Sequence, residues 1–342
     1  MVKVSTLFVL GGLAAVDAYS FPSSVSEISA SLKSALDAVP NALVRRSGGN
    51  SCPAVWTTIS SQLAPLFLGS DGQCTDLARA AIRFAFHDAG TYSINLPAYG
   101  PASGGADASL LLSADEIDRP ENGGLGPYYS WLQGFYSSYS SQISAADLIQ
   151  FAASHAIITC PGGPKVKTVV GRTDTTTASP DGLLPAGFGP NSSHDVLHAL
   201  FQSKGFSAKD LAAFLGAHST SKAFAQQANG IPSGAAQDST PGKWDINYYA
   251  ETITPPTRST IYRFPSDVNL SNASTTVGKE FRGFVGNQGK WTSAFADAMY
   301  RMSVLGIPAA TSKNFIDCTN VLPKGTSSKR DIRAAPINDR AR

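Results

Sequence analysis

Residues 80–88 read AAIRFAFHD and place Arg83 and His87 four positions apart. Apolar side chains recur at helical spacing over 77–89, so this stretch predicts a helix on which Arg83 and His87 share one face. Burying a guanidinium and an imidazole in an otherwise apolar face is costly unless something polar lies between them. The pair therefore either lines a polar site within the fold or is capped by carboxylates at a domain surface.

The same pair suits the cleavage of a peroxide bond. A neutral imidazole such as His87 takes the proton from the near oxygen and returns it to the far oxygen. The fixed charge of Arg83 stabilises the negative charge that develops as the O–O bond breaks, and it disfavours imidazolium. Asn122, six residues after Glu116, offers a side-chain carbonyl that would orient His87 through its other nitrogen. Beside two glycines, however, an asparagine is more commonly a turn residue.

A second histidine, His218, ends the apolar stretch LAAFLGAH at 211–218. A lone histidine in such a place is usually a satisfied core residue. It becomes a candidate axial haem ligand if a carboxylate accepts from its second nitrogen, because the carboxylate makes the ligand more electron-rich. Asp267 is the candidate acceptor. The other three histidines have no such context and are interpreted as structural or surface residues.

Two oxygen-rich clusters resemble calcium sites. The first consists of Asp88, directly after His87, and the segment GADAS at 105–109. The second consists of Ser219, directly after His218, with 238–240 and Asp245. Such motifs are commonly turns or helix caps. Here each cluster begins one residue after a candidate histidine, so a bound ion would clamp the helix that carries it.

The periodicity elsewhere indicates a mainly α domain with very little β structure. Apolar residues recur at helical spacing in 55–67, 77–89, 143–158, 196–201, 209–218 and 291–305, and the best strand signal is 165–171. The 342 residues, 42% of them hydrophobic, suffice to enclose a bulky prosthetic group. A net charge of +2 gives no case for nucleic acid or an acidic membrane as partner.

The chain ends predict secretion and processing. Residues 1–18 have the apolar run and small residues of a cleaved signal peptide, too short to span a bilayer. Arg45 and Arg46 mark 19–46 as a candidate propeptide, or else a linker. We expect a catalytic domain over 47–322 and a flexible, basic C-terminal tail over 323–342.

The four cysteines fit two bridges in an oxidising compartment, with three pairings open on spacing alone. None stands in a C-x-x-C pair, which makes a zinc site a poor interpretation. Three sequons, at Asn191, Asn269 and Asn272, are glycan acceptors if occupied.

Taken together, these segments resemble the plant–fungal haem peroxidase superfamily over about residues 50–320. The resemblance is closest to the secreted fungal class II type, which includes lignin and manganese peroxidases. It rests on RFAFHD at 83–88, GADASLL at 105–111, DLAAFLGAHS at 210–219 and DSTPG at 238–242. It implies two helical lobes, distal and proximal, that sandwich one non-covalent haem b.

The resemblance also implies roles for individual residues. Arg83, His87 and Asn122 would be catalytic, with Glu116 supporting Asn122, and His218 would be the axial iron ligand, bonded to Asp267. The ligands of two calcium ions would be Asp88, Gly105, Asp107 and Ser109 on the distal side, and Ser219, Asp238, Thr240, Lys243 (through its carbonyl) and Asp245 on the proximal side. The implied bridges are Cys74–Cys160 and Cys52–Cys318.

The implied activity is that of a secreted monomer that uses hydrogen peroxide to oxidise small aromatic reductants. Two one-electron steps would pass through a ferryl intermediate. The manganese-binding members carry three carboxylates where this chain has Asp76, Ala80 and Phe224, so we expect no efficient manganese oxidation. Ala213 stands where lignin-type members expose a tryptophan, and Gln237 replaces an aromatic residue beside the proximal histidine. A generic peroxidase for phenols or dyes is the remaining expectation.

Two other functions stay open at this point. One is a catalytically weak, secreted haem-binding or interaction protein of the same fold. The presence of Arg83, His87 and Asn122 together argues against it. The other is a haem-free, metal-assisted hydrolase that uses His87, His218 and the acidic clusters.

Overall fold

The computed structural model describes residues 51–94, 104–256 and 260–326. The expected signal peptide, the candidate propeptide at 19–46 and most of the tail lie outside these ranges. Within them no helix has the length and apolar character needed to cross a membrane. The mainly α fold with very little β structure is confirmed.

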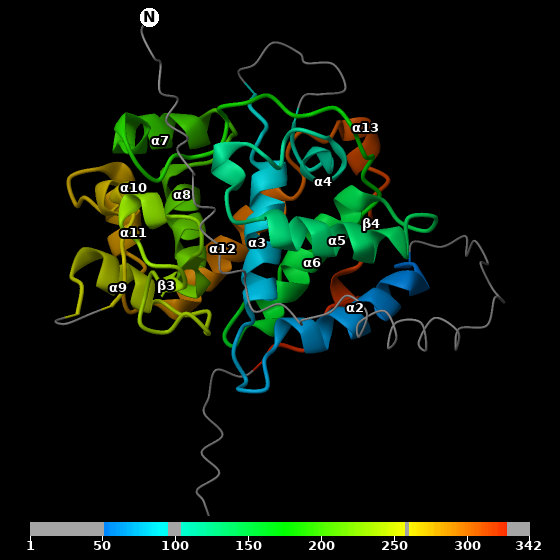
Figure 1. Cartoon of the computed structure of the whole chain (residues 1–342), viewed down its shortest axis with the longest axis horizontal. Helices are drawn as coiled ribbons and strands as arrows, with labels where there is room; N and C mark the ends of the chain where they lie inside the picture. The colour runs from blue at the N-terminus through cyan, green and yellow to red at the C-terminus, as the bar shows by residue number, and fades with distance from the viewer. Residues whose placement is uncertain (1–50, 95–103, 257–259, 327–342) are drawn as a thin grey trace, which may run out of the picture.

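The helices of the described chain fall into two groups (Figure 1). The first group holds α2 (Ala54–Phe67), α3 (Asp76–Ala89), α4 (Ser109–Leu112), α5 (Gly126–Ser137) and α6 (Ala145–Thr159). The second holds α7 (His194–Gln202), α8 (Ala208–Leu215), α9 (Asn247–Ile253), α10 (Pro265–Leu270), α11 (Thr276–Arg282) and α12 (Gln288–Met302). Short α13 (Ala309–Ser312) follows α12.

The core of the first group is α6, whose residues are all buried. Helix α3 packs along it, and α2 contacts both. A helix that is covered on every side needs small and apolar side chains all round, and α6 supplies them with the sequence AADLIQFAASHAIIT. In the second group α8 plays the corresponding part, with α11 and α12 packed against it.

The β structure consists of two small antiparallel pairs. Strand β1 (Val169–Val170) pairs with β4 (Ile316–Asp317), and β2 (Lys222–Ala223) pairs with β3 (Ala235–Ala236). The strand expected over 165–171 is therefore limited to two residues. The helix expected over 209–218 also ends early: α8 stops at Leu215, and the 3₁₀ helix η3 (Gly216–Thr220) carries His218.

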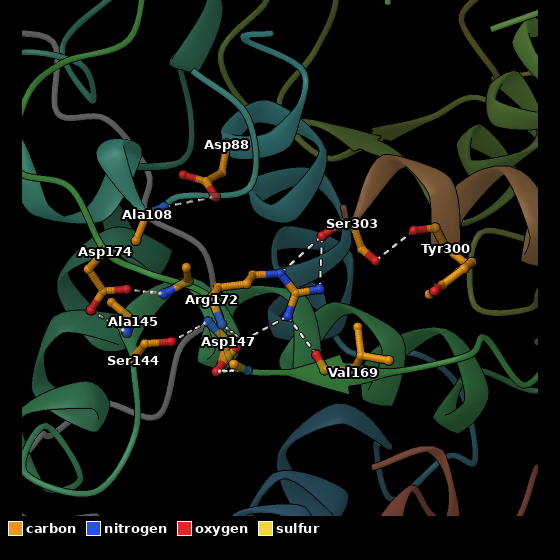
Figure 2. A network of polar contacts seen from close by, with 12 residues as sticks. Asp88, Ala108, Ser144, Ala145, Asp147, Val169, Arg172, Asp174, Tyr300 and Ser303 are labelled. Carbon is orange, nitrogen blue, oxygen red and sulfur yellow. Dashed lines mark hydrogen bonds and ion pairs between the residues drawn. The ribbon is translucent and has the colours of Figure 1, made fainter. Parts of the chain in front are cut away.

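A buried ion pair joins the two groups of helices (Figure 2). Arg172 donates to the carboxylate of Asp147 on α6 at 2.8 Å. The same guanidinium donates twice to the carbonyl of Ser303, at 3.0 and 2.8 Å, just beyond the last residue of α12. The terminal carbonyls of a helix lack partners within the helix, so Arg172 caps α12 while it neutralises Asp147.

Two disulfides close the chain on itself. Cys52 is bonded to Cys318, and Cys74 is bonded to Cys160. These are the pairings that the resemblance implies. The second bridge links the residues that precede α3 to the C-terminal end of α6, so it ties the helix that carries Arg83 and His87 to its main packing partner.

Candidate functional site

His87 and Arg83 lie on a half-buried strip of a helix that is mostly buried. Arg83, Phe86 and His87 are half-buried, whereas the side chains beside them on α3 are almost fully covered. The guanidinium of Arg83 donates to the carbonyls of Gly123 and Glu121, at 2.8 and 2.9 Å. Two partners of the Arg83 guanidinium are thus backbone carbonyls, which favours a polar site within the fold over carboxylate capping at a surface.

The proton on His87 is placed by a chain of hydrogen bonds. Nδ2 of Asn122 donates to the carbonyl of Glu116 at 2.6 Å, so Oδ1 of Asn122 faces Nδ1 of His87 at 2.8 Å. An amide oxygen only accepts, and therefore Nδ1 carries the proton. Nε2 of His87 is left as an acceptor, 3.2 Å from Nε of Arg83.

Burial, aided by a neighbouring charge, keeps the imidazole of His87 neutral. Burial lowers its pKa to about 3, and the neighbouring charge of Arg83 acts in the same direction. Glu116 contributes to this region through its backbone, since its carboxylate accepts from Ser179 instead. The resemblance implied that Glu116 supports Asn122, and in the structure the hydrogen bond between the two residues runs to the backbone carbonyl of Glu116.

His218 is oriented by a buried carboxylate. Nδ1 of His218 lies 2.9 Å from Oδ2 of Asp267, which is 1% exposed. A third of the His218 side chain remains exposed. With Nδ1 held by Asp267, the remaining ring nitrogen is the one available to a metal.

Three further side chains bond to Asp267. Tyr248 Oη donates to Oδ2 at 2.8 Å, Gln237 Nε2 donates to the same atom at 2.9 Å, and Ser266 Oγ donates to Oδ1 at 3.0 Å. The sequence singled out Gln237 but not Tyr248 or Ser266. Ser266 adjoins Asp267 in the chain, whereas no local signal points to Tyr248.

The first oxygen-rich cluster is buried and short of partners. Asp88 is fully buried, and the backbone amides of Ala108 and Leu110 approach its oxygens at 3.3 and 3.4 Å; Figure 2 shows the first of these contacts. Burial and repulsion from Asp107 raise the pKa of Asp88 well above its usual value, and burial raises that of Asp107 to about 6. Within the described chain, Ser109 Oγ is buried without a hydrogen-bond partner.

The backbone of this cluster is strained. Ala108 has a φ of 66°, and it is the one non-glycine residue with positive φ in the described ranges. A residue other than glycine rarely adopts this backbone conformation unless its surroundings impose it, as they do at ligand sites.

The second cluster has the same character. Ser219 Oγ and Asp238 Oδ2 are buried without a partner among the described residues. Burial raises the pKa of Asp238 to about 8, and the charges of Asp245 and Glu251 act in the same direction. Asn247 donates to the hydroxyl of Thr240 at the edge of the cluster.

These donor sets fit a hard cation. Among the described residues, no three or more His, Cys, Asp or Glu side chains are arranged so that they alone could hold a metal ion, so either site would have to draw on hydroxyl and carbonyl oxygens. Calcium accepts such a mixed oxygen shell, and a cation would compensate the buried carboxylates and the unpaired hydroxyls together.

The structure shows the surroundings of Asp76 and Ala213, two positions that the sequence analysis compared with manganese- and lignin-type peroxidases. Asp76 lies 2.6 Å from Arg79 and 3.8 Å from Lys222, and all three line a cavity of about 370 Å³. Asp76 is the one carboxylate among the three positions that carry carboxylates in manganese-binding members, and it is thus already next to two cations. Ala213 is buried in α8, and its carbonyl accepts from the indole of Trp291 at 3.0 Å.

The remaining histidines lie outside this region. His155 is buried in α6 and bonds to the carbonyl of Ser60 at 2.9 Å. His194 bonds to exposed Asp195, and its ring lies near that of His198.

Comparisons with known proteins agree on one family. Residues 68–285 match a family model described as peroxidase. A low-redox potential peroxidase of Taiwanofungus camphoratus is 32% identical over 287 residues, which cover 78% of this chain and 77% of that protein. A versatile peroxidase of Pleurotus eryngii is 30% identical over 292 residues, which cover 80% of this chain and 75% of that protein. A peroxidase of Arthromyces ramosus is 29% identical over 310 residues, covering 85% and 80%.

Proposed function

Because the chain belongs to the peroxidase family and is therefore an oxidoreductase that acts on hydrogen peroxide, we propose that it oxidises small phenolic or other aromatic donors in two one-electron steps. The observation that carries the proposal is the hydrogen-bond chain from Glu116 through Asn122 to His87. It leaves an unprotonated Nε2 beside the guanidinium of Arg83. That arrangement is what a peroxide requires of a general base.

One haem b is the proposed cofactor, and the residues present fit it. His218 would ligate the iron, since Asp267 fixes its Nδ1 while part of the ring stays exposed. The half-buried side chains of Arg83 and His87 would supply the groups that act on the peroxide. The haem would supply the iron at which the peroxide is reduced.

Different side chains would then transfer the proton and stabilise the developing charge. Nε2 of His87 accepts the proton of the bound peroxide and later delivers it to the leaving oxygen. Arg83, held by two backbone carbonyls, presents a fixed positive charge to the developing negative charge. Asn122 keeps the imidazole in the tautomer that can act as a base.

Organic donors are the proposed substrates rather than Mn²⁺. Asp76 stands between Arg79 and Lys222, and Ala80 and Phe224 supply no carboxylate. The carboxylate of Asp76 is therefore already compensated by two cations, which makes it a weak ligand for a divalent cation. Ala213 is buried, so the position at which lignin-type members expose a tryptophan supplies no surface aromatic.

Two calcium ions are proposed as structural cofactors. The ligands would be those implied by the resemblance: Asp88, Gly105, Asp107 and Ser109 for one ion, and Ser219, Asp238, Thr240, Lys243 and Asp245 for the other. The buried, unpaired oxygens of Ser109, Ser219 and Asp238 support both sites.

The decisive experiment changes the proposed base. His87→Leu should retain haem but react with peroxide about 10²–10⁴-fold more slowly in stopped-flow mixing, because acid and base are one group. His198→Leu, the same substitution at a half-buried histidine of α7, serves as the control and should react like the parent. An unchanged rate in His87→Leu would refute the role of His87. If the parent binds haem but does not react with peroxide, the alternative of a weak haem-binding protein holds instead.

The axial role has its own test. His218→Ala should lose or misligate haem, whereas a normal ferric spectrum would contradict the assignment. The peroxidase match argues against the haem-free hydrolase. A zinc-containing, haem-free parent protein would favour it.

The proposed enzyme is a secreted monomer. Its domains would be a signal peptide at 1–18, a propeptide or linker at 19–46, the catalytic domain at 47–322 and a flexible basic tail at 323–342. N-terminal sequencing of protein recovered from the culture medium checks the first two, and sedimentation checks the monomer. A start before residue 19 would overturn the signal peptide.

A further inference from the structure

The carboxylate that orients His218 is shared among four donors. Oδ2 of Asp267 accepts from Nδ1 of His218 at 2.9 Å, from Tyr248 at 2.8 Å and from Gln237 at 2.9 Å. Oδ1 accepts from Ser266 at 3.0 Å. A carboxylate oxygen has two lone pairs, so three donors on Oδ2 compete for the same electron density.

The amide of Gln237 is committed to this carboxylate. Turning the amide over would place Oε1 at the same distance from Oδ2 of Asp267, where two oxygens repel, so Nε2 must face the carboxylate. Oε1 of Gln237 is buried without a partner in the described part of the chain. Leaving a buried carbonyl unpaired is unfavourable, which indicates that the contact of Nε2 with Asp267 is the dominant one.

The fold brings Gln237 to this position through the pairing of β2 with β3. Strand β3 ends at Ala236, one residue before Gln237, and β3 pairs with β2, which follows the 3₁₀ helix of His218. Lys222 lies opposite Ala236 in that register. The result is that Nε2 of Gln237 also lies 3.3 Å from Nδ1 of His218.

Hydrogen bonds to a carboxylate are charge-assisted and draw on its negative charge. Each donor added by Gln237 or Tyr248 therefore weakens the pull of Asp267 on the Nδ1 proton of His218. A histidine whose proton is pulled less strongly is a less electron-rich ligand, and such a ligand favours the oxidised iron less.

We propose that Gln237, with Tyr248, is a positioning residue that limits the electron donation of Asp267 to His218 and thereby sets a higher ferric/ferrous reduction potential. The inference rests on the proposed function, because it takes His218 as the axial haem ligand. It concerns the tuning of that ligand and adds a role for two residues outside the peroxide chemistry.

The test replaces Gln237 by leucine, which is similar in size and donates no hydrogen bond. In the haem-loaded full chain, Gln237→Leu should raise the iron–histidine stretching frequency in resonance Raman spectra of the ferrous form. It should also shift the ferric/ferrous equilibrium about tenfold toward ferric, which is about 59 mV for one electron. Tyr248→Phe keeps the ring, removes the hydroxyl donor and should shift both quantities in the same direction.

Gln150 provides a matched control. It is a buried glutamine on α6, it donates through Nε2 to the carbonyl of Ala85 at 3.2 Å, and its Oε1 is likewise buried without a described partner. Gln150→Leu should cost comparable thermal stability and leave the stretching frequency and the potential unchanged. A purely structural role of Gln237 would make the two variants alike.

The outcomes separate this inference from the proposed function. No iron–histidine band in the parent protein would refute His218 as ligand. A parent band that Gln237→Leu moves no further than Gln150→Leu would overturn the inference alone. If Gln237→Leu does not fold, Tyr248→Phe decides: an unchanged frequency and potential in that variant overturns the inference.

Discussion

His155 allows a quantitative prediction about acid stability. This histidine is fully buried in α6, where Nε2 contacts the carbonyl of Ser60 at 2.9 Å and Nδ1 contacts the hydroxyl of Thr159 at 3.2 Å. Burial lowers the pKa of His155 from 6.5 to about 4. The folded chain therefore keeps His155 neutral at a pH at which the unfolded chain protonates it.

The magnitude follows from the two pKa values. The contribution of His155 to the free energy of unfolding is constant above pH 6.5. It falls as the pH decreases toward about 4, because in that range the unfolded state binds a proton that the folded state does not. One pKa unit corresponds to about 1.4 kcal/mol, so the interval from 6.5 to about 4 amounts to roughly 3 kcal/mol. Below about pH 4 the loss should level off.

His155→Gln isolates this contribution, since glutamine retains an amide donor but does not titrate. Urea unfolding of both proteins between pH 7 and pH 4 should show that the parent loses roughly 3 kcal/mol more than the variant. A difference that stays constant over this range, or a parent that resists acid better than the variant, would refute the reasoning.

Three other perturbations test the structure outside the catalytic groups. Arg172→Met should lower the free energy of unfolding by about 3–5 kcal/mol, because Asp147 loses its buried counter-charge; a change within about 1 kcal/mol in denaturant unfolding would contradict this. Chelating calcium should lower the thermal unfolding midpoint, and added Ca²⁺ should restore it; an unchanged midpoint would count against both proposed sites. Replacing Cys52 and Cys318 together by serine should cost about 5 kcal/mol, since their bridge closes a loop with a sequence separation of 266; calorimetry that finds no loss would dismiss the bridge as a stabilising link.

The long, strongly periodic helices were predictable from the sequence. The ranges expected at 55–67, 77–89 and 143–158 differ from α2, α3 and α6 by at most two residues at either end. Short helices such as α9 and α10 were not predicted, because six or seven residues show too few repeats to establish a period. The early end of α8 was missed because the apolar pattern continues past Leu215 into a tighter turn.

The residues of the candidate site likewise fall into those that the sequence indicated and those that it did not. Side chains with distinctive chemistry, such as Arg83, His87 and His218, stood out because an apolar helix does not otherwise accommodate them. Tyr248 and Arg172 did not stand out, because neither interrupts one of the apolar periodic segments, and their partners Asp267 and Asp147 meet them only in the folded chain. Long-range pairs of this kind leave no local pattern.

The bond between Cys52 and Cys318 makes nearly the whole catalytic domain a covalent ring. The candidate propeptide precedes the ring and the basic tail follows it, so trimming either end leaves the ring closed. A single proteolytic cut in a surface loop between the two cysteines would likewise not divide the molecule, because the pieces stay tethered until a reductant opens the bridge. The bridge therefore keeps both fragments of a singly nicked chain in one covalent molecule.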